Sequence, residues 1–252
     1  MSGTRFIRYT FNGEEGGARL KPGGRLEVIT GPEVERLEQV ELLPPVSPTK
    51  IVGIGLNYRE HAKEMGKKLP QEPMMFLMPS TAVIGPGQPI VLPPGYERID
   101  YEGELALIFG ERCRNVPAER AFEVLAGFCC FIDVSVRDLQ KLDVQYTRAK
   151  GFDTFAPLGP HMVSGVDPRA LRITTRLNGE KRQDSSTADM IFSIPRLVEH
   201  VTRVMTMLPG DVIATGTPPG VGPLSPGDEV EVEIESLGTL KCPVVAEDLN
   251  KD

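Results

Sequence analysis

The 252-residue sequence lacks the features that would direct it to a membrane or to a nucleic acid. No stretch approaches the roughly 20 apolar residues of a membrane-spanning helix, and the polar N-terminus lacks the apolar core of a signal peptide. No basic run is longer than Lys67-Lys68, and the formal net charge is −7. Binding to nucleic acid or to an anionic membrane needs clustered positive charge. We therefore expect neither partner.

Cysteine and histidine are also scarce. The four cysteines follow no metal-site spacing, and the adjacent pair Cys129-Cys130 would point to opposite faces of a strand. Free, buried thiols are typical of a reducing compartment, so we expect a cytoplasmic protein. The three histidines lie far apart in unlike contexts, which argues against a histidine-rich zinc or iron site.

The chain is long enough for one large domain with a small appendage. Residues 1–47 form the predicted N-terminal segment, with short strands and turns at Asn12-Gly13, Gly16-Gly17 and Pro22-Gly23-Gly24. The proline-rich stretch 43–49 connects it to a main domain, residues 48–252. This domain boundary is a prediction from local composition.

Residues 48–252 show more strand patterns than helix patterns. Apolar strand patterns occur at 76–78, 104–110 and 128–136, among others, and residues 229–242 alternate as a hairpin with one solvated face. A short helix is predicted over 57–65 and a longer one after Ser193, where apolar residues recur at helical spacing. The elements do not alternate, which predicts a β-rich α+β fold.

Two glutamates lie at the start of the most apolar strand. In an extended segment Glu102 and Glu104 share one face, and Gly103 leaves room for close approach on the other. Adjacent carboxylates repel unless they are neutralised, and Mg²⁺ prefers such oxygen ligands. The alternative is that both are solvated residues of an exposed strand, which is common.

Asp133 favours the metal site. It interrupts the apolar segment 127–135, where an unpaired carboxylate would be costly. It could cap a backbone turn, pair with Arg137, or complete a site with three carboxylates. Lys150 precedes a glycine after a polar segment; a lone lysine there is usually solvated.

A histidine and a glutamate share one face of the predicted short helix. His61 and Glu64 are three residues apart, a spacing that brings side chains together. A carboxylate beside an imidazole fixes its tautomer and raises its basicity, as a general base requires. Such pairs are frequent by chance, so the pair alone is weak evidence.

Taken together, the motifs resemble the catalytic C-terminal domain of the fumarylacetoacetate hydrolase family. Five segments carry the resemblance in the family's order: Gly55–Glu64, Tyr101–Leu105, Phe131–Gln140, Arg148–Pro160 and Gly210–Gly222. They cover roughly residues 50–245. The resemblance implies a mixed β-sandwich roll, normally a homodimer. Only about 45 residues precede the matched part, which indicates the family's shorter bacterial members.

The resemblance also implies a role for individual residues. Glu102, Glu104 and Asp133 would bind Mg²⁺ or Mn²⁺, and Lys150 would contact substrate or stabilise negative charge. His61 and Glu64 would handle protons on a lid that orders over the substrate. The remaining implied substrate contacts are Gln140 and Thr217.

These roles imply enolate chemistry on a small 2-oxo or 2-hydroxy-dienoic acid, stabilised by the metal. The expected activity is that of a 2-hydroxyhepta-2,4-diene-1,7-dioate isomerase or decarboxylase in aromatic or 2-oxo acid catabolism. An acylpyruvate hydrolase and an oxaloacetate decarboxylase are alternatives, because all these reactions share the enolate. A non-catalytic, metal-binding β-rich protein is the alternative from another class.

Overall fold

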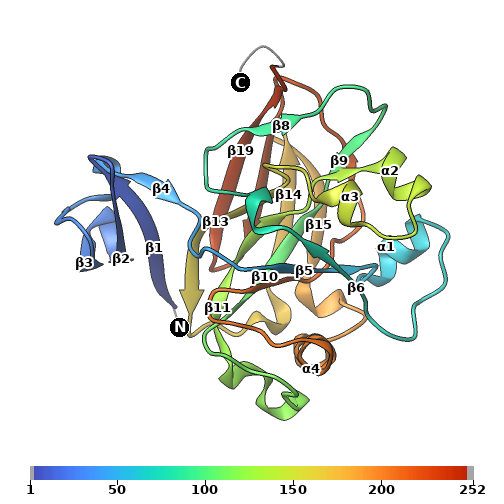
Figure 1. The fold of residues 1–252 in the computed structure, drawn as a ribbon, viewed down its shortest axis with the longest axis horizontal. Helices are drawn as coiled ribbons and strands as arrows, with labels where there is room; N and C mark the ends of the chain where they lie inside the picture. Colours follow the sequence, from blue (N-terminus) through green and yellow to red (C-terminus); the bar gives the residue numbers. More distant parts are fainter. Residues whose placement is uncertain (1–2, 249–252) are drawn as a thin grey trace.

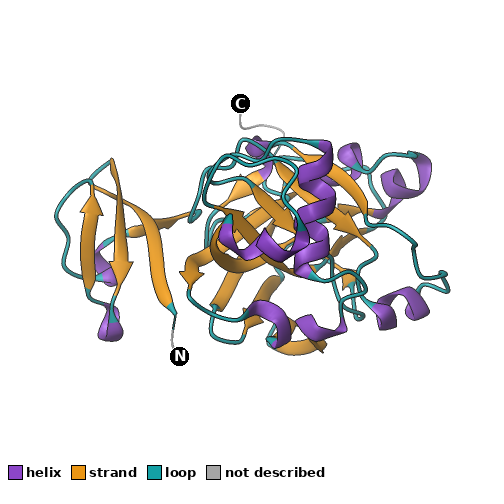
Figure 2. Ribbon diagram, turned by 90° about the horizontal axis from the view of Figure 1, so that it is seen from below, coloured by secondary structure: helices purple, strands orange, loops and turns teal. Residues whose placement is uncertain are grey.

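Nineteen strands, four α-helices and six short 3₁₀ helices make up the regular structure of residues 3–248, the part of the chain that the computed structural model describes. This confirms the β-rich α+β fold (Figures 1 and 2). The helices are α1 (Arg59–Glu64), α2 (Arg137–Leu142), α3 (Thr147–Lys150) and α4 (Ile194–Val204). The strands are β1 (Thr4–Phe11), β2 (Glu14–Leu20), β3 (Leu26–Thr30), β4 (Glu41–Leu43), β5 (Ile51–Gly55), β6 (Met74–Met78), β7 (Val83–Ile84), β8 (Ile90–Leu92), β9 (Ile99–Tyr101), β10 (Gly103–Phe109), β11 (Leu125–Ile132), β12 (Ser135–Val136), β13 (Ala156–Ser164), β14 (Arg172–Leu177), β15 (Glu180–Ser186), β16 (Val212–Ala214), β17 (Gly222–Pro223), β18 (Glu229–Ile234) and β19 (Gly238–Ala246).

The strands form three sheets. The largest has 11 strands in the order β3-β2-β1-β13-β11-β10-β16-β5-β6, with β4 on β1 and β7 on β13. A five-stranded sheet, β15-β14-β18-β19-β8, packs against β10, β11 and β13 of the large sheet. The three short strands β12-β9-β17 form the third sheet. The main core lies between the two larger sheets, as expected for sheets with apolar inner faces.

The N-terminal strands have a small core of their own. Figure 1 shows β1–β4 projecting to one side of the main body. Their buried apolar residues are Ile7, Tyr9, Ala18 and Val34. Strand β1 nevertheless pairs with β13, with Phe6 opposite Met162, so the large sheet continues into this segment. The division near residue 47 stays a prediction.

The predicted turn at Gly16-Gly17 is wrong. Both glycines lie within β2, opposite Tyr9 and Arg8 of β1. A Cβ atom on Gly16 would lie 2.4 Å from Cζ of the Tyr9 ring, so the position must be glycine for close approach and not for chain reversal. The sequence alone cannot distinguish a glycine that reverses the chain from a glycine that allows close approach between strands.

The predicted strand 128–136 is two strands that belong to different sheets. Strand β11 ends at Ile132, and β12 begins at Ser135, which pairs with Asp100 of β9. Between them lie Asp133 and Val134, outside any strand, and the Asp133 side chain bonds to Lys150. Apolar continuity cannot show that a chain changes sheets.

Other predictions are confirmed. Helix α4 follows Ser193, and strands β18 and β19 form the hairpin with one solvated face. All four cysteines are free and buried, and Cys129 and Cys130 contribute to different apolar clusters. Apart from these predictions, none of the helices in residues 3–248 combines the length and the hydropathy of a membrane span.

The most apolar strand, β10, places its two faces in two cores. Leu105 and Leu107 belong to the main core, whereas Ala106 and Ile108 belong to a second cluster on the opposite face. At its start, a Cβ atom on Gly103 would lie 2.1 Å from Oγ1 of Thr175, so the predicted close approach at this glycine is confirmed. The glycine lets the five-stranded sheet pack directly behind the acidic end of β10.

We predict that His161 makes the fold acid-sensitive. Burial, with a contribution from Arg5, lowers the pKa of His161 to about 4, and its Nε2 atom has no hydrogen-bond partner. The unfolded chain binds the proton near pH 6.5, so stability is lost as pH falls from about 6.5 toward 4. The loss from this group by pH 5 is about 2 kcal/mol.

Urea unfolding of the wild type and of His161→Gln at pH 7.5 and about pH 5 measures this effect. The variant should lose less stability between the two pH values than the wild type. Equal losses in both proteins would show that His161 does not cause the sensitivity.

Candidate metal centre and active site

Three carboxylates meet at one end of the β10–β11 strand pair. Glu104 lies opposite Phe131 in the register, and the Asp133 amide donates a 2.8 Å hydrogen bond to the Glu102 carbonyl. Because side chains alternate with a period of two, all three acids face the same side. Each is buried, and one oxygen from each lies within 4.8 Å of the others. The structure therefore brings the three predicted ligands together.

The charges of this group are unbalanced without a cation. Burial, then Asp133 and Glu102, raise the pKa of Glu104 well above its usual value. Burial likewise raises the pKa of Asp133 to about 6. Burial also opposes ionisation of Glu102, but Lys150 and Arg137 outweigh it and lower its pKa to about 2. A divalent cation would relieve the repulsion that disfavours three ionised carboxylates.

One oxygen is free to bind such a cation. Asp133 Oδ1 is buried and has no hydrogen-bond partner, although its other oxygen accepts from Lys150. An orphaned buried carboxylate oxygen is costly unless it has a ligand. Three carboxylates with no histidine or cysteine are the donor set that Mg²⁺ and Mn²⁺ prefer. The residues present thus fit a hard divalent cation.

Lys150 is buried beside the carboxylates. It lies at the end of α3, and its Nζ atom donates to Asp133 and, at 3.0 Å, to Glu102. Burial alone would lower its pKa, but Asp133 and Glu102 outweigh that effect and raise it, which keeps the amine charged. The amine also lies 5.1 Å from the centre of the Phe76 ring. A lone lysine at such a position is usually solvated, but Lys150 is buried.

Arg137 takes part in a network that the sequence did not reveal. It pairs with Asp100 at 2.8 Å and with Glu102 at 2.6 Å, and not with Asp133. Arg98 binds the other side of Asp100 at 2.8 Å. The sequence shows these residues only as charges far apart in the chain. They become partners because tertiary folding brings β9 and α2 together. Through Arg137, this network holds the Glu102 carboxylate in place.

His61 and Glu64 form the predicted pair on α1. The distance from His61 Nδ1 to Glu64 Oε2 is 2.9 Å, and Glu64 also accepts a bond from the Gly220 amide. His61 is buried, and no hydrogen bond of its Nε2 atom is found among residues 3–248. With Nδ1–H donated to Glu64, the lone pair of Nε2 can accept a proton.

The two predicted substrate residues already have protein partners. Thr217 donates to the Gly103 carbonyl at 2.9 Å and accepts from Gln183 at 2.8 Å. The Gln140 carbonyl oxygen accepts from Arg137 at 2.7 Å, which leaves its amide group as a donor. Both residues line a cavity beside the carboxylates, and their contact with substrate stays a prediction.

Gln183 is a residue that sequence reasoning missed. This buried side chain of β15 donates to Thr217 and to the Pro218 carbonyl, and it accepts from the Gly103 amide at 3.0 Å. It thereby connects the strand of the metal-binding candidates to the 215–218 loop. An isolated glutamine in a solvated-looking hairpin gives no signal of this role.

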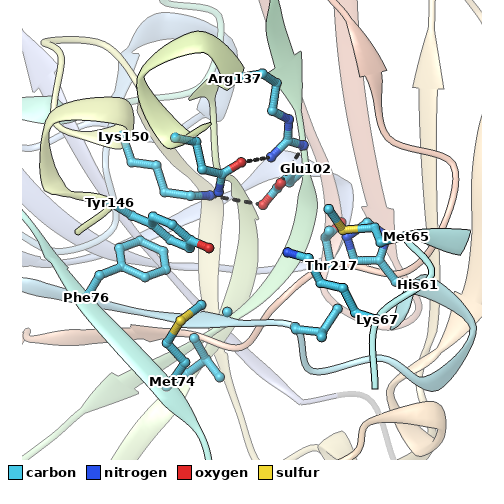
Figure 3. Close-up of a pocket in the computed structure, with 14 residues that line it drawn as sticks. His61, Met65, Lys67, Met74, Phe76, Glu102, Arg137, Tyr146, Lys150 and Thr217 are labelled. Carbon is cyan, nitrogen blue, oxygen red and sulfur yellow. Dashed lines mark hydrogen bonds and ion pairs between the residues drawn. The ribbon is translucent and has the colours of Figure 1, made fainter. Parts of the chain in front are cut away.

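A small cavity of about 50 Å³ lies beside these groups (Figure 3). Five of the predicted residues line it: His61, Glu102, Gln140, Lys150 and Thr217. Figure 3 shows Phe76, Tyr146 and Met74 forming an apolar wall opposite Glu102. Charged groups on one side and an apolar wall on the other suit a small organic anion.

The fold and the site define a class: a β-rich α+β protein with a buried carboxylate centre beside a lysine and a histidine–glutamate pair. The family described as fumarylacetoacetate (FAA) hydrolase, C-terminal, matches residues 50–245. The chain belongs to this family. An uncharacterised protein of Archaeoglobus fulgidus is 51% identical over 234 residues, 93% of each chain. The mitochondrial oxaloacetate tautomerase FAHD2A of Bos taurus is 41% identical, over 92% of this chain and 78% of its own.

Solved structures are similar along nearly the whole chain. A 5-carboxymethyl-2-hydroxymuconate delta-isomerase from Mycobacterium smegmatis has a TM-score of 0.90 at 43% identity, covering 97% of this chain and 99% of its own. A 2-hydroxyhepta-2,4-diene-1,7-dioate isomerase from Mycobacterium marinum has a TM-score of 0.88 at 39% identity, with the same coverage. A maleylpyruvate hydrolase from Sphingobium sp. SYK-6, in complex with manganese and pyruvate, has a TM-score of 0.81 at 29% identity, covering 97% and 100%.

We predict that Glu104→Gln weakens metal binding without unfolding the protein. The amide keeps the shape but removes one of three clustered negative charges, so Mn²⁺ affinity should fall by about 100-fold. Less repulsion should keep the melting temperature of the metal-free variant at or above that of the wild type.

Calorimetric titration with Mn²⁺ and thermal melts measure both effects. Glu231→Gln is the matched control, because Glu231 pairs with Lys241 on the solvated face of β18. Wild-type Mn²⁺ affinity in Glu104→Gln would remove Glu104 from the metal site.

Proposed function

We propose that the protein is a divalent-metal-dependent isomerase that moves a proton on a 2-oxo or 2-hydroxy-dienoic acid, as 2-hydroxyhepta-2,4-diene-1,7-dioate isomerases do. One observation carries the proposal: the buried carboxylate centre with its free Asp133 oxygen lies beside the His61–Glu64 pair. The named relatives support it. Oxaloacetate tautomerase and the two mycobacterial isomerases are all named for isomerisation or tautomerisation of such acids.

Glu102, Glu104 and Asp133 would hold the metal. When bound, Mg²⁺ or Mn²⁺ supplies a Lewis acid that draws electrons from the 2-oxo group and so stabilises an enolate. The manganese in the similar maleylpyruvate hydrolase supports this cofactor class. Both cations suit an all-oxygen donor set.

Lys150 and the apolar wall prepare the site for a developing negative charge. The amine of Lys150 is held by Glu102 and Asp133, so it needs little reorganisation when charge forms nearby. The wall of Phe76 and Tyr146 limits water around that charge. The low local dielectric strengthens the attraction.

His61 moves the proton in this proposal. Glu64 accepts Nδ1–H and fixes the tautomer, which leaves Nε2 to take a proton from one carbon and return it to another. Gln140 and Thr217 would position the substrate. A lid motion of the segment that carries α1 would let substrate enter.

Hydrolysis is the second candidate, because one similar structure is a maleylpyruvate hydrolase. In that reaction His61 would activate a water molecule instead of moving a proton between carbons. An acylpyruvate hydrolase and an oxaloacetate decarboxylase would use the same residues.

Assembly of the protein as a homodimer also stays a prediction.

An ultraviolet assay with Mg²⁺ or with EDTA tests the proposal. Substrates are 2-hydroxyhepta-2,4-diene-1,7-dioate, enol-oxaloacetate and acetylpyruvate. We expect isomerisation of a dienoate or an enol that EDTA abolishes. Cleavage products would replace the isomerase by the hydrolase or decarboxylase. No turnover of any substrate would favour a non-catalytic metal-binding protein.

We predict that His61→Ala lowers the isomerisation rate by about 100-fold or more, since this is the usual contribution of a positioned proton carrier. Mn²⁺ affinity should be unchanged, because His61 is not a predicted ligand. His200→Ala, on α4 and outside the cavity lining, is the control. A wild-type rate in His61→Ala would show that the pair is not part of the chemistry.

A further inference from the structure

The small cavity beside the metal centre continues into a larger one. The outer cavity has a volume of about 550 Å³, and it shares Met65, Lys67, Arg137, Gln140 and Tyr146 with the inner cavity. The shared residues come from both sides, the α1 loop and the α2 segment. A ligand whose one end lies at the carboxylates can therefore extend outward along Lys67.

The outer cavity is positively charged in a protein whose net charge is −7. Four cationic side chains line it, and only two carboxylates. The cationic residues are Arg98, Arg137, Lys67 and Lys141, and the acids are Glu64 and Asp100. Such a local excess focuses the field on an anion that enters.

Both carboxylates are already engaged. Asp100 is buried between Arg98 and Arg137, at 2.8 Å from each, and Glu64 binds His61 and the Gly220 amide. By contrast, neither Lys67 nor Lys141 has an ion-pair partner within residues 3–248. The two lysines are thus the charges left over for a ligand.

The local backbone structure orients the side chains of Lys67 and Lys141. Arg137, Gln140 and Lys141 have the i, i+3, i+4 spacing of one helix face, so α2 presents all three to the cavity. After Gly66, at φ +61°, the Lys67 amide bonds to the Ala62 carbonyl at 2.9 Å, which fixes the base of the side chain on α1. Figure 3, which draws the residues of the inner cavity, shows the Lys67 side chain extending from the α1 side toward that cavity.

We propose that Lys67 and Lys141, supported by Arg98, form a subsite for the far carboxylate of a diacid substrate. The inference rests on the proposed function, in which the metal centre holds the 2-oxo acid end. It selects among the candidate substrates: diacids such as a diene-dioate or oxaloacetate are favoured over monoacids such as acetylpyruvate. Discrimination comes from the Coulomb attraction between the far carboxylate and the two exposed, unpaired ammonium groups, which a methyl group in place of the carboxylate lacks.

A matched ligand pair tests the subsite. Calorimetry with Mn²⁺ present compares 2-oxoadipate with 2-oxohexanoate, which have the same number of carbons but differ in the terminal carboxylate. We expect the wild type to bind 2-oxoadipate about tenfold more tightly or better, and we expect added salt to reduce this preference.

Lys67→Met and Lys141→Met should each reduce the ratio of the two affinities, and Lys67→Arg should restore most of it. Lys68→Met is the matched control: Lys68 is exposed and adjacent but lines neither cavity, so the ratio should stay at the wild-type value. An unchanged ratio in the Lys67 and Lys141 variants overturns the proposal.

Oxalate separates failure of the subsite from failure of the proposed function. Equal binding of the two oxo acids by the wild type, with oxalate still bound with Mn²⁺, eliminates the subsite alone. If neither oxo acid nor oxalate binds with the metal, the proposed function and the subsite both fail.

Discussion

The structure depends on keeping three carboxylates buried at one end of two paired strands. Glu102, Glu104 and Asp133 are almost fully enclosed, and their mutual repulsion would oppose folding if nothing compensated it. Lys150 and Arg137 supply two positive charges, and both come from short helices that follow β12. A divalent cation would complete the balance. Helices α2 and α3 thus carry the two cations that face the carboxylates.

The surrounding fold holds the carboxylates at fixed positions. Gly103, between two of them, allows the five-stranded sheet to pack directly behind β10, and Gln183 of that sheet bonds the Gly103 amide. The same glutamine bonds Thr217, while the Gly216 amide bonds Glu104 at 2.8 Å. The five-stranded sheet and the 215–218 loop therefore both bond to the adjacent residues Gly103 and Glu104 of the large sheet. The buried polar groups of the site have hydrogen-bond partners on other strands and on a loop, and these bonds hold the site residues in place.

Much of this could be predicted from particular residues. Strand periodicity put Glu102 and Glu104 on one face, the spacing of His61 and Glu64 brought them together, and Asp133 was conspicuous in an apolar segment. Other expectations failed because their cause was not local. Position 16 requires glycine because the Tyr9 ring approaches it from another strand. Arg137 pairs with Asp100 and Glu102, and nothing in the sequence indicated these partners.

By itself the sequence determined the β-rich class, the acidic strand and the motifs that place the chain in its family, because these depend on residues close together along the chain. The tertiary structure alone decided which charges neutralise which. It buried Lys150 against Asp133, joined Gln183 to Gly103 from a distance of 80 residues, and left Lys67 and Lys141 unpaired beside the cavity. The physical reason is that an ion pair or a buried hydrogen bond depends on distance in space, which strand pairing and sheet packing set and local periodicity cannot.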